Sequence, residues 1–91
     1  MKRYIYIKWK PASPSDPVHT YSELDGARNE MRKVEIYGNG TRGFADGDEE
    51  VGGTFLGSTP IPPLAELAGD PSFEAKDITA DEFQRHWLKR R

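Results

Sequence analysis

A chain of 91 residues has room for one hydrophobic core, so we expect residues 1–91 to form a single domain. The absence of cysteine excludes a disulfide framework, a thiolate metal site and a cysteine nucleophile, and it fits a reducing compartment. The net charge is only −2, but ten carboxylates and one lysine lie between residues 46 and 82, whereas the flanking segments are basic. Such a divided pattern can steer a charged partner, which affects association more than fold.

The first half of the chain has the alternation expected of β-strands. Residues 4–9 alternate between polar or tyrosine side chains and a second set that we expect to face the core: Ile5, Ile7 and Trp9. Residues 11–17 hold three prolines, which lack the N–H that a β-ladder needs, so a loop is predicted there. A second strand is expected from about Val18 to Leu24.

A third strand is expected over residues 28–37, between turn residues on both sides. Every second side chain would share one face, with charges at one end and apolar residues at the other: Arg28, Glu30, Arg32, Val34 and Ile36. The Asn39-Gly40 pair predicts a type I′ turn and a tight hairpin to a fourth strand over residues 41–46. Residues 54–57 are the candidate fifth strand.

Two helices are predicted in the last third of the chain. A short helix covers residues 64–68, because prolines suit its first turn and Gly69 supplies a stop. A second begins at the capping box of residues 79–82 and carries Phe83 and Trp87 on one stripe. Strands first and helices last favour an α+β fold: an antiparallel sheet of four to five strands with two C-terminal helices packed on one face. The helical residues expected to cover Ile5, Ile7, Trp9, Val34 and Ile36 are Leu64, Leu67, Phe83 and Trp87.

No pattern in the chain indicates a catalytic centre, so we expect a protein that is not an enzyme. His19 and His86 have no serine or carboxylate at a spacing typical of a catalytic triad. The acidic residues near position 48 lack the spacing of a calcium loop, and the glycines match no phosphate-binding motif. We therefore assign no catalytic residue, no metal and no cofactor.

Two groups of charged residues are the candidate partner-binding sites. The first is a glycine-rich acidic loop with Asp46, Asp48, Glu49 and Glu50. The second is the charged end of the third strand, with Arg28, Glu30 and Arg32. This second group would either close the sheet with internal ion pairs or form a recognition patch, and we prefer the structural interpretation.

Five stretches that span nearly the whole chain carry a resemblance to a known family: residues 21–25, 32–37, 43–45, 50–54 and 60–62. Together they resemble a family of small bacterial proteins of about this length whose function is uncharacterised. The resemblance implies a stand-alone domain with one continuous fold. It implies no catalytic residues.

Our leading hypothesis is a small protein-binding module of the inhibitor or immunity type, which masks a basic surface of its protein partner through an acidic patch. The alternative is a nucleic-acid or nucleotide binder that uses the basic N-terminal strand and the tail at residues 89–91, although a pI near 5.6 makes nucleic acid the less expected partner. An enzyme also stays open, because paired carboxylates need no linear motif: the candidates are Glu23, Asp25 and Glu30 with Arg32 as an anion clamp.

Location and assembly are less constrained. The start of the chain is charged too early for a signal peptide, and no apolar stretch is long enough to cross a membrane, so we expect a cytoplasmic protein. The oligomeric state stays open. An unpaired edge, at the second or fifth strand, would allow dimerisation by strand addition.

Overall fold

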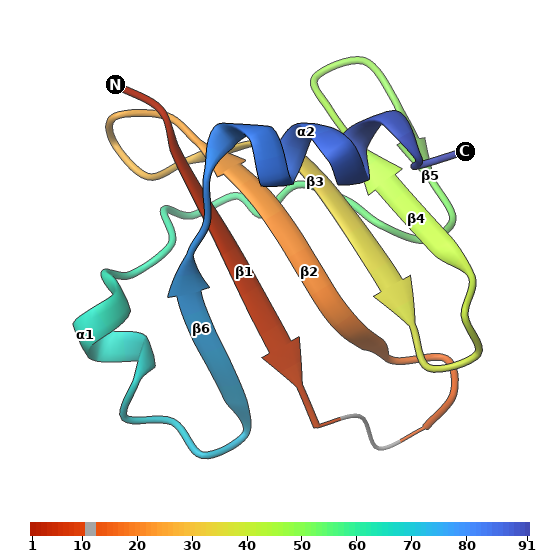
Figure 1. The fold of residues 1–91 in the computed structure, drawn as a ribbon, viewed down its shortest axis with the longest axis horizontal. Coiled ribbons are helices and arrows are strands. Elements are labelled where there is room, and N and C mark those ends of the chain that lie inside the picture. The colour runs from red at the N-terminus through yellow and green to blue at the C-terminus, as the bar shows by residue number, and fades with distance from the viewer. Residues whose placement is uncertain (11–12) are drawn as a thin grey trace.

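A six-stranded antiparallel sheet forms the frame of the protein in the computed structural model, which describes residues 1–10 and 13–91 (Figure 1). The α+β class is confirmed, with more strands than expected. The strands lie in the order β5-β4-β3-β2-β1-β6. In chain order the elements are β1 Arg3–Trp9, β2 Pro17–Leu24, β3 Glu30–Tyr37, β4 Arg42–Ala45, β5 Glu50–Val51, α1 Leu64–Leu67, β6 Phe73–Asp77 and α2 Ala80–Leu88.

The first four strands lie where the alternation predicts them, and β1 to β4 pair as successive antiparallel neighbours. The expected proline-rich loop ends at Pro17, where β2 begins. The first two residues of that expected loop, Pro11 and Ala12, lie outside the described residues.

The hairpin between β3 and β4 is confirmed, but its turn is not of type I′. Asn39 does not have the positive φ that this turn requires at its first central residue. Gly40 has a φ of 85°, and its N–H donates to the carbonyl of Tyr37 at 2.9 Å. The loop therefore has three residues and is closed by a glycine bulge.

The expected fifth strand at residues 54–57 is wrong, because the chain leaves the sheet earlier. β5 is a two-residue strand paired with β4, and it is followed by Gly52 and Gly53, whose φ angles are 73° and 84°. These left-handed conformations turn the chain out of the sheet. Residues 54–63, which we call the covering segment, then pass behind the strands in Figure 1.

The last strand, β6, was not predicted from the sequence. It pairs with β1 along its whole length, with Asp77 opposite Ile5 and Phe73 opposite Trp9. Glutamate, alanine, lysine and aspartate have low strand propensity. Pairing with β1, which is distant in sequence, therefore sets the conformation of this segment.

α2 covers one face of the sheet, which we call the helix face. Its core is formed by Val34, Phe44, Phe83 and Trp87, with Tyr4, Tyr21 and Ile78 partly buried against them. The predicted cap is confirmed, since the Thr79 hydroxyl accepts the N–H of Glu82 at 3.1 Å. The stripe of Phe83 and Trp87 is buried, as its spacing predicts.

The opposite face, which we call the loop face, has a separate core. It contains Ile5, Ile7 and Leu24, against which Trp9, Ile61, Phe73 and Ala75 pack. The expectation that Val34 shares a face with Ile5 and Ile7 is wrong, because Val34 lies opposite Tyr21, which lies opposite Tyr6. Tyrosine rings are amphipathic and can be buried under a helix, so the tyrosine side of β1 is the one that α2 covers.

The two helices do not share a face. Leu67 of α1 lines a cleft on the loop face together with Ile7 and Phe73. The predicted single core under both helices is therefore divided between the two sides of the sheet.

Candidate functional site

The predicted acidic loop is a tight turn between β4 and β5. The Asp46 carboxylate accepts the backbone N–H groups of Asp48 and Glu49, both at 2.8 Å, and these bonds lower its pKa. Glu49 forms an ion pair with Arg91 at 2.8 Å. Part of the negative charge of this loop is therefore compensated within the protein, while Asp48 and Glu50 are exposed.

Arg28, the first residue of the other predicted patch, holds the covering segment. It has a φ of 68°, and its guanidinium donates to the carbonyls of Ile61 at 2.6 Å and Pro62 at 2.9 Å. The Arg28 carbonyl accepts the N–H of Ile61 at 2.9 Å. Arg28 thus fixes where the covering segment crosses the loop face.

Glu30 lies on the opposite face from Arg32, so the expectation that the two share one face is wrong. The register of β2 and β3 shifts between Glu23 and Leu24, and this irregularity reverses the alternation. Glu30 is only 9% exposed, forms an ion pair with Lys33 at 3.0 Å and accepts the Ser22 hydroxyl at 3.4 Å. Glu30 also accepts the N–H of Gly57 and so fixes the covering segment to the loop face of the sheet.

Arg32 lies on the helix face, between the sheet and α2. Its guanidinium makes two bonds to the Glu23 carboxylate, at 2.8 and 2.7 Å, and lies about 5 Å from the ring centres of Phe83 and Trp87. Hydrogen bonding to Arg32 lowers the pKa of Glu23. The three residues of the predicted patch thus occupy three separate structural positions, and their role in partner binding stays a prediction.

The remaining acidic residues gather at the other edge of the sheet. Five exposed carboxylates lie in α1, the loop after it, β6 and the first turn of α2: Glu66, Asp70, Glu74, Asp77 and Asp81. Among residues 1–10 and 13–91, none of these five takes part in an ion pair. Figure 1 shows β6 and α1 on the left and the β4–β5 turn on the right. The acidic middle of the sequence therefore forms two groups, and within the described residues only the first contains an ion pair.

β6 presents a free main-chain edge. The N–H of Ile78 donates to Tyr4 at 2.9 Å, and that of Lys10 donates to Ser72 at 3.2 Å. Because hydrogen-bonded and non-hydrogen-bonded pairs alternate in an antiparallel ladder, the N–H and C=O groups that point away from β1 are those of Phe73, Ala75 and Asp77. The unpaired edges of the sheet are thus β6 and β5, whereas β2, an expected edge, is internal.

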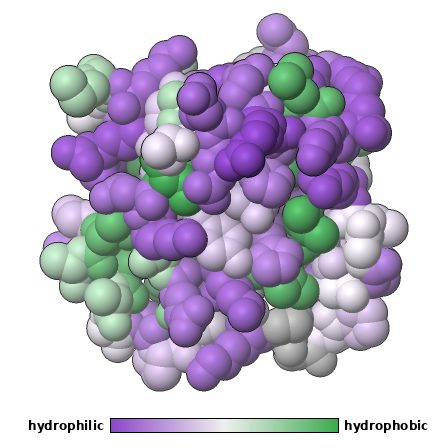
Figure 2. All heavy atoms as spheres, viewed as in Figure 1, coloured by the Kyte–Doolittle hydropathy of each residue, from purple (hydrophilic) through white to green (hydrophobic). Residues whose placement is uncertain are grey.

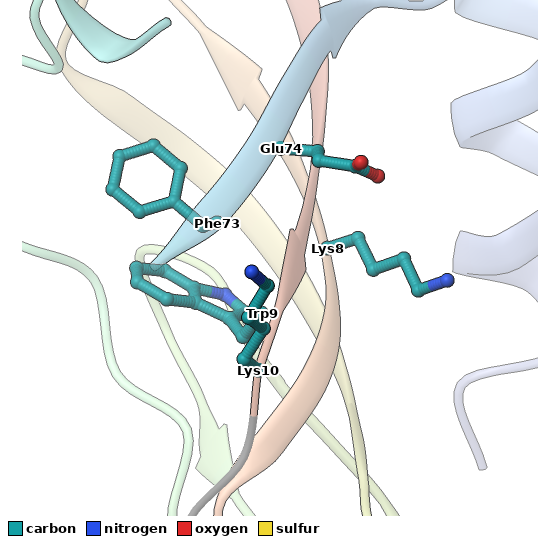
Figure 3. Close-up of a pocket in the computed structure, with 5 residues that line it drawn as sticks. All are labelled: Lys8, Trp9, Lys10, Phe73 and Glu74. Carbon is teal, nitrogen blue, oxygen red and sulfur yellow. The ribbon is translucent and has the colours of Figure 1, made fainter. Parts of the chain in front are cut away.

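An aromatic pair lies at one end of this edge. The rings of Trp9 and Phe73 are 5.0 Å apart. Figure 3 shows both rings on one side of the paired strands, with Lys8 and Glu74 directed to the other side. These residues and Lys10 line a small hollow of about 190 Å³.

A larger cleft of about 340 Å³ lies between the loop face and the covering segment. Its floor is polar and carries Thr20, Ser22, Glu30, Lys33 and Glu35, while Trp9, Phe73, Ile61 and Pro62 are among the residues of its walls. The prediction from sequence missed this cleft. The signal was present, because the positions of β2 and β3 that alternate with the helix-face residues are polar rather than apolar.

The histidines contact tyrosines. The His19 ring lies 2.7 Å from the hydroxyl of Tyr6, and that of His86 stacks on Tyr21 at 3.7 Å between centres. Burial lowers the pKa of both histidines, so they are mainly neutral near pH 7.

Two of the residues expected of a nucleic-acid binder pack inside the protein, whereas the basic residues Lys2, Arg3, Lys8, Lys10 and Lys89 are exposed. Tyr4 packs against Phe83 at 5.5 Å, and Arg90 stacks on Trp87 at 4.2 Å. Figure 2 shows a mostly hydrophilic surface on the side of α2, with hydrophobic residues in small separate groups. No helix of the described residues is long and apolar enough to span a membrane.

The chain belongs to a family described as a domain of unknown function (DUF6881), whose profile matches residues 3–91. The expected membership of an uncharacterised family is thereby confirmed. No curated protein and no solved structure shows a significant match to the chain.

Proposed function

We propose that this protein is a protein-binding module that adds a basic, extended segment of a partner to the free edge of β6. The observation that carries the proposal is the unpaired main chain of Phe73, Ala75 and Asp77 beside carboxylates that form no ion pair within residues 1–10 and 13–91. A strand that pairs with an exposed edge gains main-chain hydrogen bonds, and side-chain contacts on both faces select its sequence.

The charges at this edge favour a cationic segment. Glu74 projects to the helix face, and Asp77 to the loop face, so a partner strand meets a carboxylate on either side. Phe73 provides an apolar contact at the other end. Lys76 is the one basic residue of β6, and its ammonium lies 5.5 Å from the centre of the Tyr6 ring.

An inhibitor or immunity-type role fits such a module. A small domain that caps a basic segment of a toxin, nuclease or defence complex would mask a surface that the partner needs. Charge complementarity would raise the association rate and make it salt-sensitive.

The edge is tested with a labelled peptide of alternating lysine and valine, and with its glutamate–valine counterpart as the control ligand. Fluorescence anisotropy at low salt measures binding to the wild type, Ala75→Pro and Ala75→Val. Proline removes the outward N–H at position 75 without removing a bond to β1, whereas valine keeps that N–H. We expect the basic peptide to bind the wild type and Ala75→Val, and to lose binding to Ala75→Pro.

The charge is tested with two matched pairs of substitutions. Glu74→Gln with Asp77→Asn should weaken binding of the basic peptide, whereas Asp48→Asn with Glu50→Gln, at the far edge, should not. NMR of the wild type gives a second reading, since the amide signals of Phe73, Ala75 and Asp77 should shift on binding. Equal binding of both peptides, or equal binding to the proline and valine variants, would contradict the proposal.

A further inference from the structure

The cleft on the loop face has the size and lining of a small-molecule site. Its volume of about 340 Å³ falls within the range of ligand pockets, which begins at roughly 300 Å³. Aromatic and apolar residues form its walls, and polar side chains form its floor. This combination is typical of sites that bury the body of a ligand and orient its polar group.

The polar floor is not explained by packing alone. Thr20 and Ser22 are 3% and 1% exposed, at strand positions that face a covering layer. Such positions are normally apolar, because a buried polar group must find hydrogen-bond partners. The hydroxyls here serve as donors to carboxylates: Ser22 to Glu30 and Thr20 to Glu35.

The two carboxylates of the floor differ in their partners. Both oxygens of Glu30 lie within 3.1 Å of the Lys33 ammonium, and the N–H of Gly57 donates to one of them. Among the described residues, Glu35 accepts side-chain hydrogen bonds only from the hydroxyls of Thr20 at 3.3 Å and Tyr37 at 3.4 Å. Within residues 1–10 and 13–91, no basic side chain forms an ion pair with Glu35. The floor thus carries one uncompensated negative charge.

Trp9 is held beside this charge. Its indole N–H donates to the Thr20 hydroxyl at 2.9 Å, and the same hydroxyl donates to Glu35. Phe73 packs against the indole, with 5.0 Å between ring centres. The carboxylate therefore lies beyond the N–H edge of the indole, so a ligand can place a cationic group on Glu35 and an apolar body against the aromatic wall.

We propose that this cleft binds a small organic cation with an aromatic or alkyl body, whose charged nitrogen group donates to Glu35 and whose body lies between Trp9 and the covering segment. An anion is disfavoured, because Lys33 is already paired with Glu30 and Glu35 repels negative charge. Both sites include Phe73, but the cation is held by Glu35 and Trp9, which are not part of the main-chain edge of β6, so each proposal can fail without the other.

The probes are benzamidine, choline and tyramine, with benzamide as the neutral analogue and benzoate as the anionic analogue of benzamidine. Binding is followed by the NMR signal of the Trp9 indole N–H during titration at low salt. We expect at least one cation to shift this signal, and the neutral and anionic analogues to shift it far less. Absence of a shift with every cation at about 10 mM, well above the roughly 1 mM dissociation constant of a weak ligand, would overturn the proposal.

The Glu35→Gln variant keeps a group that can accept from Thr20 and removes the charge. It should weaken binding of the cation about tenfold or more, the change expected when a charged hydrogen bond is lost. The control is Glu50→Gln, which changes the same charge at an exposed position of the far edge. Trp9→Leu gives a second, independent variant and should also weaken binding. Unchanged affinity in both cleft variants, with folding verified by circular dichroism, would refute the assignment.

Discussion

The buried ion pair between Glu23 and Arg32 allows a measurement of what holds α2 to the sheet. Glu23 is 2% exposed and accepts two bonds from Arg32, and its other nearby cation is Lys2 at 3.9 Å. Arg32→Met keeps an apolar stem under Phe83 but leaves the carboxylate buried without its main partner. Removing one member of a buried pair costs about 3–5 kcal/mol. Because Lys2 compensates part of the charge, we expect a loss of about 3 kcal/mol, the lower end of that range.

Thermal and urea unfolding give the assay. A loss of about 3 kcal/mol should lower the Tm of a domain of this size by roughly 12–24 °C. The control is Arg91→Met, which breaks the ion pair with Glu49 at a similar distance of 2.8 Å, but between side chains that are 61% and 44% exposed. An exposed pair is worth about 1 kcal/mol or less. If Arg32→Met destabilises the protein no more than Arg91→Met, the reasoning from burial is refuted.

The pH dependence gives a separate reading of the same pair. Arg32 lowers the pKa of Glu23 below the ordinary value of 4.5, so the folded protein releases this proton more easily than the unfolded chain does. The stabilisation is therefore complete above pH 4.5 and is lost as the pH falls through the lowered folded-state value. Urea unfolding at a series of acidic pH values should show a shallower decline for Glu23→Gln than for the wild type. If the free energy of unfolding falls equally fast with pH in both proteins, another carboxylate controls the loss of stability at acidic pH.

Two further substitutions test the packing on the helix face and the path of the chain after β5. Trp87→Ala should reduce the free energy of unfolding by about 3–5 kcal/mol, because it empties a buried aromatic site. The control is Leu88→Ala at the exposed neighbour, which should change the free energy of unfolding by about 0.5 kcal/mol or less. Similar urea midpoints for the two variants would contradict the assigned core. Gly43→Ala should lower the Tm severely, since a Cβ at this position would lie 2.2 Å from the Thr54 hydroxyl. Adding Thr54→Ala to the same chain should restore part of the lost stability. A wild-type Tm for Gly43→Ala would show that Thr54 does not pack against residue 43.

Features set by a few neighbouring residues were predictable. The cap at Thr79, the buried stripe of Phe83 and Trp87 and the β3–β4 hairpin depend on interactions within a short stretch, and all are present. The pairing of β6 was not predictable in this way. Its conformation depends on β1, and its own residues do not favour a strand.

The candidate site was harder to predict than the fold, because side chains adjacent in sequence were separated by the sheet. One register shift placed Glu30 and Arg32 on opposite faces. The strand order placed Asp48 and Glu74 at opposite edges, although both belong to one acidic stretch of the sequence. Likewise, Glu35 and Trp9 lie on strands separated by β2, and only the ladder brings them to one cleft. Register and strand order are global properties, which local patterns do not determine.

The pairing of β6 with β1 also has a consequence for how the polypeptide is made. The meander of β1 to β4 can assemble as soon as it is synthesised, but its two outer surfaces are completed only by segments translated much later. Until residues 80–88 emerge, Val34 and Phe44 have no cover, and the nascent chain exposes an apolar strip that other chains could contact. Contacts between such distant segments also slow the final step of folding. We therefore expect chaperones to bind the ribosome-bound chain until α2 docks on the sheet.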